Sequence, residues 1–399
     1  MDMKRDLGRW DALAAGRTRG GSDGIASVMA LLGRTDIISF AGGFPDPDTF
    51  PRERVAALMR EFVETGEARA FQYTPTRGLA GALDALAGRL ERLQGRRPDD
   101  AELVITSGGI EALELVGKSF LDPGDTVVVE APTYLGAIQS FRGFEADMVA
   151  VPLDAGGLDV DDLARRLSAG LRPKLVYTIP EHQNPAGVSL AAERRAPLIA
   201  LARRYGFLIV EDVAYRELGF TNEAPPSLWS EAPDVVVQIG TTSKTFFPGV
   251  RLGWAAAPPE VAARLVSAKQ NTDQCAGGLG QRLFEESERR GWIDEQLVRS
   301  RALYRRKGER LTAALQRVMP DGAAWTRPEG GFFSWLTLPP GVDSAGLARR
   351  AVEAGVGVVP GRLFFPDERG GDTLRLSFSQ VDEARIDAGV ERLAALIAD

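Results

Sequence analysis

The sequence predicts an α/β fold that gives way to a smaller α+β unit. From Glu102 onward, short apolar runs alternate with segments of helical periodicity, as in layered α/β proteins. The run 207–210 is entirely apolar, which is typical of a strand covered on both faces. After Pro320, short strands surround one helix, and this pattern indicates the change to α+β.

The elements follow in order along the chain. Residues 1–35 form an expected N-terminal arm with a short helix at 25–32, followed by a strand at 37–40. The other expected strands are 103–106, 126–130, 144–151, 174–179, 207–210, 235–239, 252–257, 324–326, 330–338, 356–359 and 373–378. The other expected helices are 52–65, 79–93, 110–120, 159–167, 191–205, most of 260–290, 292–318, 344–354 and 382–398.

Composition excludes several classes of function. The formal charge of -7 argues against a nucleic-acid-binding or anionic-membrane surface, since both require basic clusters. One cysteine and one histidine, His182, exclude an internal disulfide and zinc sites built from several such ligands. No apolar run reaches the ~20 residues of a membrane span, and the first residues lack a signal-peptide core. We therefore expect a cytoplasmic protein without a metal site.

Polar and small residues follow several predicted strands. Ser107-Gly108-Gly109 lies between a strand and a helix, where free N–H groups can bind an anion. Tyr134, Asn184 and Asp212 each lie at or just beyond a strand end, where α/β proteins gather their ligand sites. Each has a structural alternative, such as a salt bridge for Asp212, but their common position predicts one site.

Lys244 is the centre of the most informative segment, residues 238–254. It follows Thr241 and Ser243 and precedes Arg251 by seven residues. A lysine amine can bond covalently to an aldehyde, while hydroxyls and a guanidinium hold a phosphate. The pattern therefore favours a phosphate-bearing aldehyde cofactor, and the alternative is a surface lysine in a hydroxyl-rich loop.

Further candidates lie outside that segment. Gly42-Gly43 before Phe44-Pro45 predicts a tight loop that can approach a ligand closely. Tyr73 follows a helix and is either a core residue or a ligand contact. Arg375 alternates with apolar residues in its strand, which indicates a ligand carboxylate or a salt bridge. His182 is expected to shape its loop rather than titrate in the site.

Together these motifs resemble the fold type I pyridoxal 5′-phosphate (PLP) enzymes, specifically the class I/II aminotransferases. The nearest resemblance is to the branch of 2-aminoadipate, kynurenine and aromatic aminotransferases. The resemblance implies a mostly parallel, seven-stranded sheet in a large PLP-binding domain at 36–300, and a small α+β domain at 301–399 that packs with the N-terminal segment. The motifs that carry it are SFAGGFPDPDTFP, YTPTRG, APTYLGAIQ, QNPAG, VEDVAYREL, TTSKTFFPGVRLGW, RPEGGFFSWLTLP, VVPGRLFF and LRLSFS.

The resemblance also implies roles for individual residues. Lys244 bonds covalently to the cofactor and carries the proton, Asp212 pairs with the pyridine nitrogen, and Tyr134 stacks on the ring. Tyr73 reaches the neighbouring subunit's phosphate, which implies a homodimer. The implied cofactor contacts are Gly109, Ile110, Tyr134, Asn184, Asp212, Tyr215, Thr241, Ser243, Lys244, Arg251 and Tyr73. The implied substrate contacts are Gly43, Asn184 and Arg375.

The implied reaction transfers the amino group of an L-amino acid to a 2-oxo acid by a ping-pong mechanism. Ala26 stands where the aminoadipate branch has an arginine, and Gly109 lacks the usual hydroxyl of the phosphate turn. Phe44, Phe332 and Phe333 would suit an apolar or aromatic side chain, whereas Arg17, Arg19 or Arg34 could still serve a 2-aminoadipate-like one. The alternatives are another PLP-dependent reaction (β-elimination, decarboxylation or cyclisation) and a non-enzymatic PLP-binding sensor.

Overall fold

The computed structural model describes residues 10, 13–18, 34, 36–221, 224–367 and 369–398. The expected helix at 25–32, with Ala26, lies outside the described residues. Arg17 lies in a short 3-10 helix, Gly16–Thr18, and Arg34 pairs with Asp36 at 2.5 Å.

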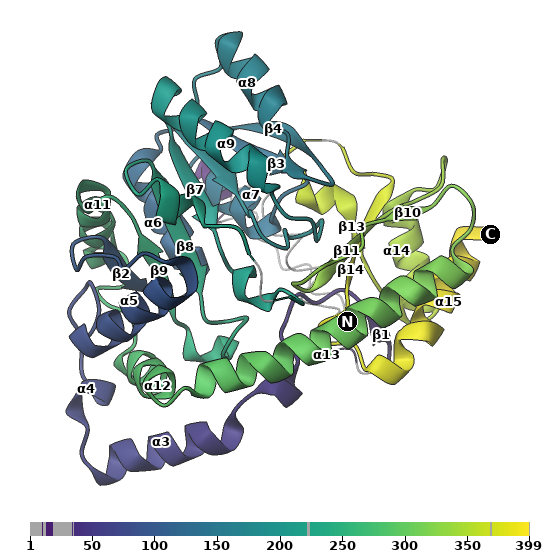
Figure 1. Ribbon diagram of the computed structural model, residues 1–399. Helices are drawn as coiled ribbons and strands as arrows, with labels where there is room; N and C mark the ends of the chain where they lie inside the picture. Colours follow the sequence, from purple (N-terminus) through teal and green to yellow (C-terminus); the bar gives the residue numbers. More distant parts are fainter. Residues whose placement is uncertain are drawn as a thin grey trace.

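An eight-stranded sheet forms the centre of the larger part (Figure 1), in the order β2-β9-β8-β7-β6-β3-β4-β5. Strands β8, β7, β6, β3 and β4 run parallel, and β9 pairs antiparallel with both β8 and β2. The strands are β2 (Leu103–Thr106), β3 (Thr126–Ala131), β4 (Asp147–Asp154), β5 (Gly157–Leu158), β6 (Leu175–Thr178), β7 (Leu208–Asp212), β8 (Val236–Thr241) and β9 (Gly253–Ala256).

The expected count of seven strands is wrong by one. The additional strand, β5, is two residues long and folds back antiparallel on β4, and its first residue, Gly157, pairs with Asp154 and has φ +81. So short a strand has no hydrophobic periodicity and is recognisable only through its partner. Strand β4 also begins three residues later than expected, because the helix α7 (Leu135–Gly143) precedes it and a turn follows that helix.

Helices pack against the sheet, whose central strands are buried almost throughout. Both faces of these strands are covered, and this explains why their sequences are apolar almost without interruption. The other helices of this part are α3 (Arg52–Glu64), α4 (Ala68–Phe71), α5 (Ala80–Gln94), α6 (Gly109–Phe120), α8 (Val160–Ser168), α9 (Ala192–Tyr205), α10 (Leu228–Glu231), α11 (Pro259–Gln270) and α12 (Gly278–Arg289).

A four-stranded antiparallel sheet, in the order β10-β11-β14-β13, forms the smaller part. The expected strand at 356–359 is two strands, because β12 pairs in parallel with β1 while β13 joins the larger of the two small sheets. The elements are β1 (Ile38–Ser39), β10 (Ala324–Trp325), β11 (Phe333–Thr337), β12 (Val356–Gly357), β13 (Val359–Pro360), β14 (Thr373–Ser377), α14 (Ser344–Glu353) and α15 (Ile386–Ala398).

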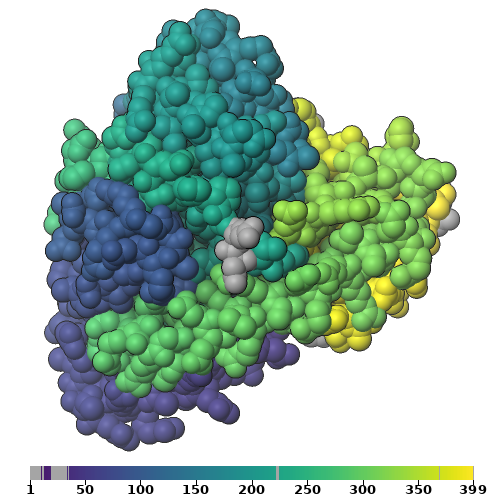
Figure 2. All heavy atoms as spheres, viewed as in Figure 1, coloured from purple at the N-terminus to yellow at the C-terminus, as the bar shows by residue number. Residues whose placement is uncertain are grey.

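Helix α13 (Trp292–Val318) connects the two parts. It packs against α12 at one end of its sequence and against α15 over the other. In the space-filling view its green atoms run beneath the larger part towards the yellow C-terminal region (Figure 2). The helix is continuous through residue 300, and the domain boundary there stays a prediction.

One hydrophobic core extends through both parts, and a smaller apolar cluster lies where they meet. That cluster brings Ala41 and Leu135 together with Trp335 and Phe364. It therefore fixes the small sheet next to the carboxyl ends of the parallel strands. Among the described helices, none is long and apolar enough to cross a membrane.

Candidate active site

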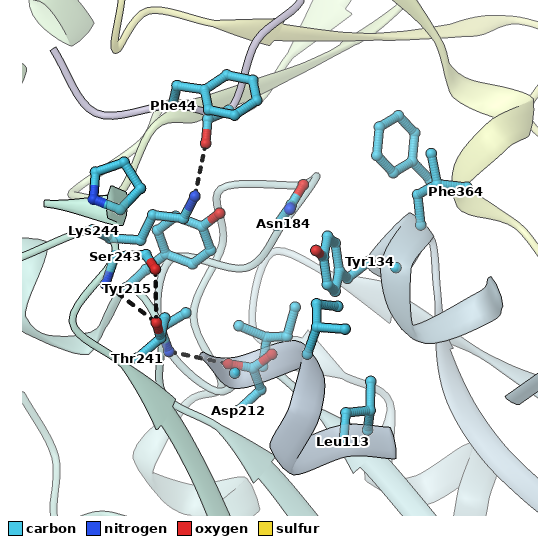
Figure 3. Close-up of a pocket in the computed structure, with 18 of the residues that line it drawn as sticks. Phe44, Leu113, Tyr134, Asn184, Asp212, Tyr215, Thr241, Ser243, Lys244 and Phe364 are labelled. Atoms are coloured by element: carbon cyan, nitrogen blue, oxygen red, sulfur yellow. Dashed lines mark hydrogen bonds between the residues drawn. The ribbon is translucent and has the colours of Figure 1, made fainter. Parts of the chain in front are cut away.

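A cavity of about 320 Å³ lies at the carboxyl ends of β6, β7 and β8. The loop around Gly43 and the strand β14 of the smaller part close it. Figure 3 shows Lys244, Ser243 and Thr241 along one side and Tyr134 and Phe364 along the other. Residues far apart in sequence meet here because parallel strands end at the same edge of the sheet.

Lys244 projects into this cavity just after β8. Its Nζ donates to the backbone oxygen of Gly43 at 2.9 Å and lies 5.8 Å from the ring centre of Phe44. Burial, followed by the positive charges of Arg375 and Arg251, lowers the pKa of Lys244 to about 8, against the opposing effect of Asp212. A substantial fraction of this amine is therefore neutral and nucleophilic near physiological pH.

Asp212 ends β7 and lines the same cavity. Its Oδ2 accepts from the hydroxyl of Tyr177 at 2.8 Å, and its Oδ1 accepts from the N–H of Ala214 at 3.1 Å. Burial raises the pKa of this carboxyl, and the Tyr177 hydroxyl opposes the rise most strongly. Within the described chain Asp212 forms no ion pair, so it presents an unneutralised charge that suits a ligand cation.

The first turn of α6 and Arg251 form a corner rich in N–H donors. Gly108 precedes the helix with φ +104, and Arg251 Nη2 donates to Ser107 O at 3.0 Å. A side chain at Gly108 would be strained at this φ, and its Cβ would lie 2.5 Å from Arg251 Nη2, so glycine favours the approach of the guanidinium to this turn. Thr241 Oγ1 and Ser243 Oγ lie 2.9 Å apart beside them. Such a corner suits a phosphate, because helix N-terminal N–H groups and the cation act together.

Two tyrosines line the cavity between Asp212 and Arg375. Burial, then the charge of Asp212, raises the pKa of Tyr134 to about 12. Burial also raises the pKa of Tyr215, whose hydroxyl contacts the side chain of Asn184. Both hydroxyls therefore stay protonated and can act as hydrogen-bond donors.

Arg375 is the second buried cation of the cavity. Its Nη1 donates to Asn184 Oδ1 at 3.1 Å and its Nη2 to Ala41 O at 2.6 Å. Its guanidinium lies between the rings of Phe333 and Phe364, at 4.5 and 4.8 Å from their centres. Burial lowers the pKa of Arg375 to about 10, its Nε has no partner, and no described carboxylate pairs with it. A buried cation held only by neutral groups suits an anionic ligand.

The structure brings nearly all the predicted residues together. The described lining includes Gly43, Gly109, Ile110, Tyr134, Asn184, Asp212, Tyr215, Thr241, Ser243, Lys244, Arg251 and Arg375. Asp212 is the only acidic residue in this described lining, against three basic ones. Tyr73 is the exception, because it lies outside the cavity and is 80% exposed. The roles of all these residues stay predictions.

Sequence reasoning missed other residues of the site. Tyr177 contacts Asp212 from β6, and Phe364 lines the cavity from the short 3-10 helix Gly361–Phe364. The only available signal for Tyr177 was its hydroxyl in a short buried strand, where the neighbouring Thr178 carries another. His182 does not line the cavity. It is partly buried at φ +49 against Gly330 and Gly331, where desolvation lowers its pKa to about 4.

Comparison with known proteins gives a consistent result over nearly the whole chain. Residues 35–393 match the family model "Aminotransferase class I and II". Aromatic-amino-acid aminotransferase 1 of Thermococcus litoralis is 40% identical over 379 residues, covering 94% of this chain and 91% of the relative. The 2-aminoadipate transaminase of Thermus thermophilus is 41% identical over 388 residues, covering 96% of each.

Solved structures agree with these relatives. The α-aminoadipate aminotransferase of Thermus thermophilus superposes with a TM-score of 0.90 at 38% identity and 98% coverage of both chains. That structure contains N-(5′-phosphopyridoxyl)-L-leucine.

Proposed function

Because the chain belongs to the aminotransferase class I and II family and is a PLP-dependent transaminase, we propose that it acts on L-amino acids with apolar or aromatic side chains. The amino group passes to a 2-oxo acid in the second half of the reaction. Bound PLP supplies a ring that withdraws electrons from the substrate α-carbon. The side chains of the protein attach the cofactor, orient the substrate and carry the proton.

The cavity fits PLP in both charge and donor set. Lys244 supplies an amine for covalent attachment of the aldehyde, and its Nζ is placed to accept and return the α-proton of the substrate. At the other end, the N–H groups of Gly109 and Ile110 hold the phosphate with Arg251. The remaining phosphate contacts are the hydroxyls of Thr241 and Ser243.

The ring of the cofactor is held by four side chains in this proposal. Asp212 pairs with the protonated pyridine nitrogen, because it is a carboxylate in the cavity wall without a cation of its own among the described residues. Tyr134 stacks on the ring. Asn184 and Tyr215 donate to the phenolic oxygen, and their mutual contact fixes both side chains.

Arg375 is the main support for a substrate with a carboxylate. It lines the cavity with Lys244, lacks a carboxylate partner among the described residues, and has an unpaired Nε. Arg375 and Lys244 also bind the same loop, at Ala41 and Gly43. A carboxylate bound by Arg375, with help from Asn184 and the backbone of Gly43, therefore brings the substrate's α-carbon towards Nζ.

The preference for apolar or aromatic side chains rests on two aromatic residues. Phe44 lies beside Lys244, and Phe364 lies on the opposite side of the cavity against Arg375 (Figure 3). Beyond Arg375, Arg251 and Lys244, the described lining holds no cation for a distal carboxylate. The leucine adduct in the α-aminoadipate aminotransferase from Thermus thermophilus supports an apolar side chain. A 2-aminoadipate-like substrate is the second candidate, because the chain is 41% identical to a 2-aminoadipate transaminase.

A homodimer completes the proposed site. Tyr73 and Phe71 are 80% and 62% exposed, and Ile110 at the phosphate corner is 41% exposed. Large exposed apolar residues, one of which lines the cavity, support a covering partner. In the dimer, Tyr73 of each subunit reaches the phosphate bound by the other.

The test is amino-group balance with purified protein, an aromatic amino acid and a 2-oxo acid. Equal amounts of the new 2-oxo acid and the new amino acid, without ammonia, are expected. Lys244→Ala should abolish both products, whereas Lys174→Ala, at a surface ion pair with Asp125, should not change them. Release of ammonia or carbon dioxide in place of the new amino acid would contradict the proposal.

A further inference from the structure

Tyr177 reaches Asp212 because of the register between two neighbouring strands. It lies on β6 opposite Val210 of β7. Asp212 is two residues beyond Val210, so its side chain points to the same face of the sheet. The two residues therefore meet at the strand ends, below the cavity that Asp212 lines.

The carboxylate of Asp212 is held on both oxygens by neutral donors. Tyr177 Oη donates to Oδ2 at 2.8 Å, and Ala214 N–H donates to Oδ1 at 3.1 Å. The ring of Tyr177 is itself held edge-on against Phe141 of α7, with centroids 5.9 Å apart. The Tyr177 side chain is thus held at its ring by Phe141 and at its hydroxyl by Asp212, to which the hydroxyl donates.

The hydroxyl is not explained by packing. Tyr177 is fully buried, and β6 is otherwise made of residues that face the core. Phenylalanine would fill the same volume without the cost of burying a hydroxyl. A buried hydroxyl whose bond goes to the carboxylate of the cavity indicates a role at that carboxylate.

We propose that Tyr177 is a positioning residue that keeps Asp212 ionised and oriented towards the pyridine nitrogen of the cofactor, an inference that rests on the proposed role of Asp212. The hydroxyl lowers the basicity of Oδ2, so the proton shared between carboxylate and ring stays on the ring nitrogen. A protonated ring withdraws electrons more strongly than a neutral one.

The electrostatics of the site support this arrangement. Burial raises the pKa of Asp212, and the bond from Tyr177 is the strongest effect in the opposite direction. Burial, then the neighbouring charge of Asp212, holds the pKa of Tyr177 well above its ordinary value. Tyr177 therefore remains a donor over the whole physiological range of pH.

The experiment reads the ring nitrogen directly. Apoprotein is loaded with PLP that carries ¹⁵N in the ring, and the ¹⁵N resonance and the cofactor's dissociation constant are measured. Tyr177→Phe should move the resonance towards the value of neutral pyridine and weaken binding by about tenfold, as expected for one hydrogen bond to a charged group. Tyr304→Phe is the matched control, because that tyrosine is equally buried and its hydroxyl also takes part in hydrogen bonds, including one from Asp46 N.

Three outcomes separate the possibilities. A wild-type resonance and dissociation constant in Tyr177→Phe, with a changed resonance in Asp212→Asn, overturns the role of Tyr177 alone. An unchanged resonance in both variants overturns the proposed role of Asp212 and this inference with it. If Tyr177→Phe does not fold, 3,5-difluorotyrosine at position 177, a stronger donor, should move the resonance in the opposite direction. An unmoved resonance in that protein would overturn the inference.

Discussion

Replacing Arg375 by leucine should remove recognition of the substrate carboxylate. The side chain donates one N–H each to Asn184 and Ala41, at 3.1 and 2.6 Å, and keeps Nε and the other terminal N–H groups for a ligand. Two charge-assisted hydrogen bonds at about 1.5–3 kcal/mol each amount to about 3–6 kcal/mol. This corresponds to a loss of roughly 10²- to 10⁴-fold in the second-order rate constant.

The assay compares phenylalanine with phenylethylamine, which has the same side chain but no carboxylate. The rate of amino transfer to bound PLP is followed by absorbance in a single turnover. Arg375→Leu should slow phenylalanine by the factor given above and change phenylethylamine little. The rate of Arg375→Lys with phenylalanine should lie between those of the wild type and Arg375→Leu, because a lysine keeps the charge but not the bidentate geometry.

A structural defect would slow both compounds alike, so equal losses of rate for phenylalanine and phenylethylamine would contradict the proposed role of Arg375. Arg305→Leu is a suitable control, since Arg305 is exposed and pairs only with Glu309 among the bonds described for it.

The remaining predictions concern pH and assembly. Burial and two cations lower the pKa of Lys244 to about 8. The rate of PLP attachment to the apoprotein should therefore rise with pH and level off above about 8, and Arg375→Leu should move this inflection upward. An inflection near 10.5 in the wild type would contradict the lowered pKa. His182 has a folded pKa of about 4 against 6.5 when unfolded, so its contribution to stability is present above pH 6.5 and is lost as pH falls, by about 3 kcal/mol at pH 4. Denaturant unfolding should therefore show a weaker acid dependence in His182→Asn, and parallel losses in both proteins would contradict this. Tyr73→Phe should weaken PLP binding, and mixing these subunits with Lys244→Ala subunits should restore one wild-type site per mixed dimer; no restoration would contradict a shared site.

The sequence predicted that several polar residues would gather in one cavity, because they follow the ends of apolar strands. Asp212 and Lys244 could be placed in one cavity without knowing the order of the strands, since parallel strands end at a common edge. The paired glycines at 42–43 likewise predicted the loop that binds Lys244 and Arg375.

The sequence could not predict features that depend on which segments lie next to each other in the fold. The contact of Tyr177 with Asp212 requires β6 to lie next to β7 in one particular register. Strand β5 and the division of 356–360 between β12 and β13 are likewise defined by pairing, because two-residue strands carry no periodicity. Helix α7 was missed because it has glycines near both ends and one charged residue, so its pattern is weak. The proposed role of Tyr73 requires a second copy of the chain, which one sequence cannot position.

The central claim is tested most directly by mixing the PLP-loaded protein with single amino acids in the absence of an acceptor. Aromatic and aliphatic amino acids should replace the visible absorbance of bound PLP with the near-ultraviolet band of pyridoxamine 5′-phosphate. Glutamate and 2-aminoadipate should do so poorly. Faster conversion by 2-aminoadipate would contradict the proposed substrate class, and conversion by no amino acid would contradict amino transfer through Lys244.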